Sequence, residues 1–90
     1  MIGKEIEAAL NKQISAEANA SHLYLAMASW AETRGFEGVS NFFYSQSDEE
    51  RQHMLKLVRY VNERGGHAKA PAVNEPSKMF DCLTHVFQNF

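Results

Sequence analysis

Apolar side chains recur at helical spacing along the first third of the chain. Residues 4–33 contain no proline or glycine and are rich in Ala, Leu, Glu and Lys, so we expect one long helix that ends at Arg34-Gly35. Steps of three and four residues place a stripe along one face of this helix: Ile6, Leu10, Ile14, Glu17, Ser21, Tyr24, Ala28 and Ala31. A glutamate therefore lies inside a largely apolar stripe.

A second apolar row follows a different face of the same helix. It consists of Leu23, Met27 and Trp30. One core seam does not require this many apolar positions, so the row indicates core packing or contact with another subunit.

A second helix is predicted over about residues 38–64. Gly38 or Ser40 is a suitable start, and Gly65-Gly66 supplies a left-handed stop. The seam of this helix is apolar at both ends and polar in the middle: Val39, Phe43, Gln46, Glu50, His53, Leu57 and Tyr60. The polar centre lies where a buried stripe would normally continue.

The two predicted helices form an antiparallel hairpin because only a few residues join them. Glu17 precedes the turn near Arg34 by almost as many residues as separate Arg34 from Glu50. The two carboxylates are therefore expected at the same height in the hairpin, within reach of one ion.

The remaining residues predict a crossover loop over about 65–77, which contains both prolines, and a third helix over about 78–90. No Gly or Pro closes the last helix, which predicts a helix cut short at Phe90. We therefore expect a single all-α domain over residues 1–90. Its fold is predicted to be an antiparallel helical hairpin plus a short third helix, which completes a four-helix bundle with a second chain.

Length and composition favour a small intracellular protein with partner chains. Ninety residues bury only a limited core, so an oligomer is expected. The net charge is −2 and the basic residues are scattered, which argues against nucleic acid as a partner. We expect the cytoplasm rather than a membrane or an oxidising compartment. Cys82 is the only cysteine, the N-terminus does not resemble a signal peptide, and no apolar run approaches the ~20 residues of a membrane-spanning helix.

Glu50 and His53 are the candidate chemistry of the second helix. A Glu-x-x-His pair presents a carboxylate and an imidazole on one helix face, although the pattern alone is weakly specific. Burying these groups beside Glu17 requires hydrogen bonds, ion pairs or a metal, and no Lys or Arg is expected at that level of the seam. Oxygen-rich ligands with one imidazole and no thiolate favour iron or manganese over structural zinc.

This ligand set is half of a known arrangement. Di-iron carboxylate bundles use single glutamates from two helices and Glu-x-x-His from the other two. One copy of the chain contributes Glu17 and the Glu50–His53 pair, and two copies related by a two-fold axis would contribute all of the ligands.

The chain resembles a bacterial non-haem ferritin subunit over its first two helices, its crossover loop and the start of its third helix. The resemblance rests on the ordered motifs QISAE, LYLAM, GFEG and EERQH. It implies that Glu17 is an iron ligand, Glu50 a carboxylate bridging two irons and His53 an imidazole ligand. It also implies that Tyr24 lies beside the centre and that Glu49 holds iron at a neighbouring site.

The same resemblance implies ferroxidase activity, in which Fe(II) is oxidised to Fe(III) by dioxygen or peroxide for iron storage or detoxification. It gives no support for haem, because haem-binding bacterioferritins carry a methionine where this chain has Arg51. Ferritin subunits are about twice as long, and their later helices supply further carboxylates. We therefore expect either a homodimer or higher homo-oligomer that shares the centre, a truncated ferritin, or a dimerising hairpin that binds metal without turnover.

Each candidate residue also has a purely structural interpretation. Glu17 is an ordinary helix-surface charge in that interpretation, Glu50 and His53 form a buried hydrogen-bonded pair, Glu49 is solvated, and Tyr24 is a core residue with a satisfied hydroxyl. The other histidines have no evident seam partner and are expected at the surface: His22, His67 and His85.

Overall fold

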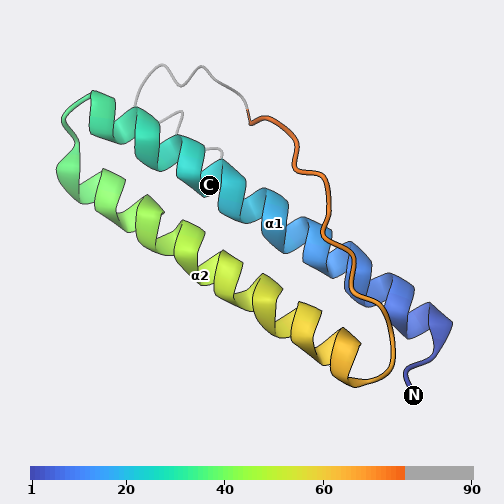
Figure 1. The fold of residues 1–90 in the computed structure, drawn as a ribbon. Coiled ribbons are helices and arrows are strands. Elements are labelled where there is room, and N and C mark those ends of the chain that lie inside the picture. Colours follow the sequence, from blue (N-terminus) through green and yellow to red (C-terminus); the bar gives the residue numbers. More distant parts are fainter. Residues whose placement is uncertain (77–90) are drawn as a thin grey trace.

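Two long antiparallel helices form the body of the protein (Figure 1). The computed structural model describes residues 1–76, in which α1 spans Lys4–Thr33 and α2 spans Glu37–Glu63. The bounds of α1 equal those expected from the sequence, and those of α2 differ from the expected range by one residue at each end. The predicted helix over 78–90, with Cys82 and His85, lies outside the described residues.

Glycines with positive φ follow both helices at the predicted positions. Gly35 has φ of 78° after α1, and Gly65 has φ of 84° after α2. Glycine adopts this conformation without the steric cost that a Cβ atom imposes. After the first of these turns, the amide of Phe36 donates to the carbonyl of Ala31 at 2.9 Å, which closes the end of α1.

The predicted start of α2 at Gly38 or Ser40 is wrong, because the helix begins at Glu37. The amide of Ser40 already donates to the carbonyl of Phe36 at 2.9 Å within the first turn. The Ser40 side chain is buried instead, and its hydroxyl donates to the carbonyl of Ala28 at 3.1 Å. A residue that would suit a helix cap thus joins the two helices.

The core follows the contact between α1 and α2. One cluster consists of the buried residues Met27, Ala28 and Phe43, with Leu23, Tyr24, Ala26, Trp30 and Val39 packed against it. Met27 is 0% exposed and belongs to the core, whereas Leu23 and Trp30 of the same row pack against the cluster and are only partly buried. The apolar positions of the two predicted seams are not all buried. At the end of the hairpin away from the turn, Ile6 is 58% exposed and Tyr60 is 42% exposed.

Residues 65–76, here called the strap, run in extended form along α1 (Figure 1). Asparagine side chains of α1 hold the strap by its backbone. Asn11 accepts a hydrogen bond from the amide of Lys69 at 2.8 Å and donates to the carbonyl of His67 at 3.1 Å. Further along, the amide of Asn74 donates to Asn19 at 3.0 Å. These bonds satisfy backbone groups that no helix or sheet would satisfy.

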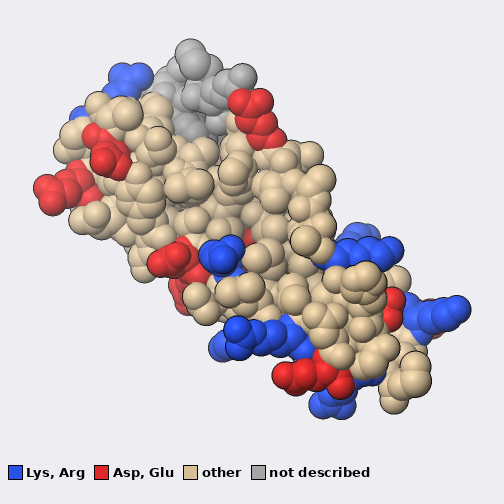
Figure 2. All heavy atoms as spheres, in the orientation of Figure 1, with Lys and Arg blue, Asp and Glu red and all other residues tan. Residues whose placement is uncertain are grey.

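Charged side chains of both signs are interspersed on the face shown in Figure 2, as the scattered charges in the sequence predict. Within residues 1–76, neither helix is long and apolar enough to cross a membrane.

Candidate metal centre

Three potential metal ligands from two helices converge halfway along the hairpin. Glu17 comes from α1, and Glu50 and His53 come from α2. One ligand atom of each residue lies within 4.8 Å of the others. His53 Nδ1 is 3.6 Å from Glu17 Oε2 and 3.7 Å from Glu50 Oε2. The expectation that the two glutamates share one height in the hairpin is therefore confirmed.

The carboxylates are more enclosed than the imidazole. The Glu17 and Glu50 side chains are 17% and 22% exposed, whereas that of His53 is 48% exposed. Glu17 Oε2 is buried and has no hydrogen-bond partner in the described part of the chain. A buried carboxylate oxygen without a donor is unfavourable by several kcal/mol unless a cation or proton meets it.

The two carboxylates also perturb each other. The contact between the two carboxylates lowers the pKa of Glu17 and raises the pKa of Glu50, and burial adds to the rise at Glu50. Two adjacent carboxylates repel each other when both are ionised, so a proton binds more readily to Glu50 than to Glu17 in this pair. A cation that displaces this proton would neutralise both groups.

Tyr24 lies beside this pair. Burial is the main cause that raises the pKa of its hydroxyl, and the negative charges of Glu50 and Glu17 raise it further. The ring stacks on Phe43 with centroids 6.2 Å apart. Tyr24 therefore joins the core cluster to the carboxylates, which combines the structural and the functional interpretations of this residue.

Glu49 lies outside the group formed by the three ligands. It is exposed, and its carboxylate accepts a weak hydrogen bond from Gln46 Nε2 at 3.4 Å. Its assignment to a neighbouring iron site stays a prediction. His22 and His67 are exposed, as expected.

Contacts of Gln13, Ser21 and Ser47 support the group and were not foreseen from the sequence. Gln13 Nε2 donates to Glu17 Oε1 at 2.9 Å. Ser21 Oγ donates to the carbonyl of Ser47 at 2.8 Å, and Ser47 Oγ donates to the carbonyl of Ser21 at 2.7 Å. The spacing of Gln13 four residues before Glu17 was a usable signal, whereas the serine pair depends on the register between the helices.

The donor set suits a hard or borderline divalent cation. Carboxylate oxygens and one imidazole nitrogen favour iron or manganese, and no thiolate is available in the described residues near the group. The unpartnered Glu17 Oε2 lies at the centre of this set, where a cation would meet it. The residues present therefore fit a metal ion.

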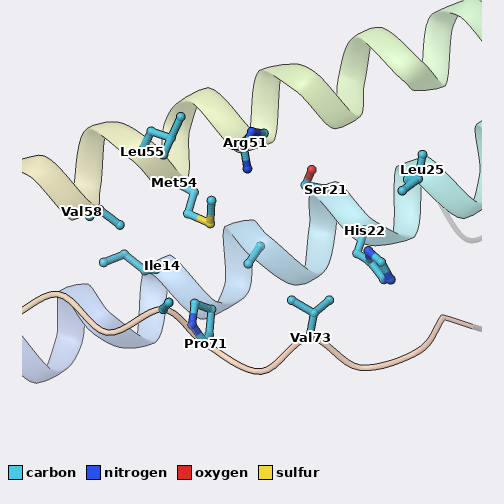
Figure 3. Close-up of a pocket in the computed structure, with 12 residues that line it drawn as sticks. Ile14, Ser21, His22, Leu25, Arg51, Met54, Leu55, Val58, Pro71 and Val73 are labelled. Carbon is cyan, nitrogen blue, oxygen red and sulfur yellow. The ribbon is translucent and has the colours of Figure 1, made fainter.

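A separate apolar groove of about 460 Å³ lies between the two helices and the strap (Figure 3). Ile14, Met54 and Pro71 are among the residues that line it, and Arg51 and His22 lie at its polar part. None of the three potential metal ligands lines this groove.

Comparisons with known proteins assign the chain to a family. The ferritin-like domain matches residues 7–90. The chain is 39% identical to the bacterial non-heme ferritin of Staphylococcus aureus (strain USA300) over 89 residues, which cover 99% of the chain and 54% of that protein. It therefore spans about half the length of the curated relatives it matches.

Solved structures agree with this assignment. An open-pore ferritin from Archaeoglobus fulgidus superimposes with a TM-score of 0.91 at 39% identity, over 99% of this chain and 55% of that chain. A ferritin from Chlorobium tepidum superimposes with a TM-score of 0.92 at 34% identity, again over 99% and 55% of the two chains. The all-α hairpin of this protein thus has the ferritin fold, and the chain belongs to the ferritin-like domain family.

Proposed function

We propose that the chain binds Fe(II) through Glu17, Glu50 and His53, and that a pair of chains oxidises the iron to Fe(III) for storage or detoxification. The observation that carries the proposal is the convergence of the three ligands around a buried carboxylate oxygen that lacks a hydrogen bond. The similarity to bacterial non-heme ferritin supports iron as the metal. Iron is the substrate of this reaction.

The proposed centre is completed by a second copy of the chain. Three protein ligands supply half of the di-iron arrangement found in carboxylate bundles. The half-exposed His53 ring places one side of the group at the surface of the hairpin. An isologous pair of hairpins brings two identical groups together across a two-fold axis and forms a four-helix bundle.

Within the pair, the residues have distinct roles. The carboxylates of Glu17 and Glu50 offset the positive charge that increases when each Fe(II) loses one electron. Two Fe(II) ions supply two electrons, which reduce dioxygen, and two protons from water complete the hydrogen peroxide that forms. Tyr24 borders the carboxylates and joins them to the core through its stacking on Phe43.

A second candidate function is metal binding without turnover by the hairpin. The incomplete ligand set of a single chain favours it. Such a site would accept Zn(II) as readily as Fe(II), because it would have no role in electron transfer. The additional iron site at Glu49, the absence of haem and the cytoplasmic location stay predictions.

Aerobic oxidation of Fe(II) tests the proposed function. Fe(III) formation is followed by ultraviolet absorbance, and sedimentation gives the oligomeric state of the same sample. We expect rapid oxidation by a dimer or larger oligomer, loss of this activity in Glu50→Ala, and full activity in Glu63→Ala, an exposed carboxylate on the same helix. Undiminished oxidation by a proven monomer would contradict a shared centre. Saturable but redox-silent binding would favour the second candidate.

A further inference from the structure

The carboxylate of Glu17 is held asymmetrically. Gln13, one turn earlier on α1, donates its amide to Oε1 at 2.9 Å. The other oxygen, Oε2, has no hydrogen bond and lies 3.6 Å from His53 Nδ1. One oxygen is thus tied to the helix surface, and the other faces the ligand group.

This asymmetry affects how the carboxylate can bind a cation. The terminal torsion of a glutamate is broad and nearly two-fold, so an unrestrained carboxylate rotates easily and can chelate an ion through both oxygens. A hydrogen bond to Oε1 fixes the plane of the group and occupies a lone pair of that oxygen. Oε2 is then the oxygen that faces the other ligands without a competing hydrogen bond.

We infer that Gln13 is a positioning residue that restricts Glu17 to one-oxygen coordination and leaves a position open on the bound ion. This inference deepens the proposed function and rests on it. An open position is what an iron-oxidising site requires, because the oxidant must reach the metal. Hydrogen bonds to ligating groups commonly set the geometry and affinity of a metal site in this way.

The competing interpretation is an ordinary helix-surface pair. Polar side chains four residues apart stabilise many helices without any function, and Gln13 is exposed. A purely structural pair would alter helix stability but not the coordination number of a bound ion. The test therefore needs a spectroscopic measurement of coordination.

Co(II) is a suitable probe, because its visible absorption bands are strong at four- or five-coordinate sites and weak at six-coordinate sites. The wild-type chain is titrated with Co(II) alongside Gln13→Met, which preserves side-chain length and helix propensity but removes the donor. Gln52→Met, at an exposed position of α2, is the matched control. Circular dichroism verifies that all three proteins retain their helices.

We expect Gln13→Met to weaken Co(II) binding about tenfold and to lower the intensity of the visible bands, since Glu17 becomes free to chelate. Gln52→Met should match the wild-type protein. Unchanged affinity and spectrum in Gln13→Met, or equal changes in both variants, would overturn the role of Gln13 alone. Failure of the wild-type chain to bind Co(II) would instead overturn the metal-binding function and this inference with it.

Discussion

Glu17 and Glu50 are adjacent carboxylates that change each other's pKa. The contact between them accounts for the opposite directions of their pKa shifts. Without metal, the protonation of this pair therefore depends on pH, and the same two side chains are ligands in the proposed function.

Replacing Glu50 by Gln is expected to stabilise the metal-free protein at neutral pH. The folded-state pKa of Glu50 is raised, so its stabilising contribution is present below its ordinary pKa and is lost as pH rises through the raised value. Thermal midpoints measured in chelator from pH 4 to pH 8 should fall less steeply with rising pH in Glu50→Gln than in the wild-type protein. A variant less stable than wild type at pH 7 would contradict the raised pKa of Glu50.

The lowered pKa of Glu17 affects the pH dependence of stability in the opposite direction, at low pH. The pKa of Glu17 is lowered, so its stabilising contribution is present above its ordinary pKa and is lost as pH falls through the lowered value.

Metal affinity should increase with pH as Glu50 loses its proton, since cation and proton compete for the same oxygens. Co(II) titrations at several pH values measure this dependence, and affinity independent of pH would contradict it.

At the scale of the elements, two serines fix the contact between α1 and α2 next to the metal ligands. Ser21 lies four residues after Glu17, and Ser47 lies three residues before Glu50. Each hydroxyl donates to the backbone carbonyl of the other serine. This reciprocal arrangement sets the helix spacing within one turn of the site.

Ser47→Ala should therefore lower the free energy of unfolding by about 1 kcal/mol, because it removes the hydrogen bond from Ser47 Oγ to the carbonyl of Ser21, while Ser21 Oγ keeps its bond to the backbone carbonyl of residue 47. Denaturant titration measures the change. Ser45→Ala, at an exposed serine of the same helix, is the control and should lie within about 0.5 kcal/mol of wild type. Equal effects of the two substitutions would show that the serine pair has no special role.

The strap depends on side chains of α1 for its position. Asn11→Ala removes both the acceptor for the Lys69 amide and the donor to the His67 carbonyl. Hydrogen exchange at the Lys69 amide should become about tenfold faster, which corresponds to the loss of about 1.4 kcal/mol of local protection. Asn41→Ala, at an exposed asparagine of α2, should leave that exchange rate unchanged.

The sequence predicts the helices well because local signals determine them. Gly35 and Gly65 mark the helix ends, and equal spacing from the turn predicts that Glu17 and Glu50 meet. The start of α2 was misplaced because Ser40 forms a contact between helices rather than a cap. The Ser21–Ser47 pair depends on the rotation and spacing of packed helices, which periodicity does not specify.

At the scale of the whole molecule, the three candidate ligands of one chain make up half of the proposed centre. A hairpin of this size buries a small core, and several large apolar side chains at its surface are exposed, Ile6 and Phe42 among them. Together with the half-exposed His53, this surface supports the proposed pairing of two copies. A two-fold pair would bury apolar area and complete the ligand set in one step.

An anaerobic Fe(II) titration of the purified chain, with Glu50→Ala as the matched variant, tests the central claim most directly. Equilibrium dialysis measures the bound iron at several chain concentrations. We predict saturation near about one iron per chain, weaker binding as the chains are diluted below the concentration at which they pair, and no saturable binding by Glu50→Ala. Equal binding by the variant, or no saturable binding by the wild-type chain at any concentration, would contradict an iron centre built from Glu17, Glu50 and His53.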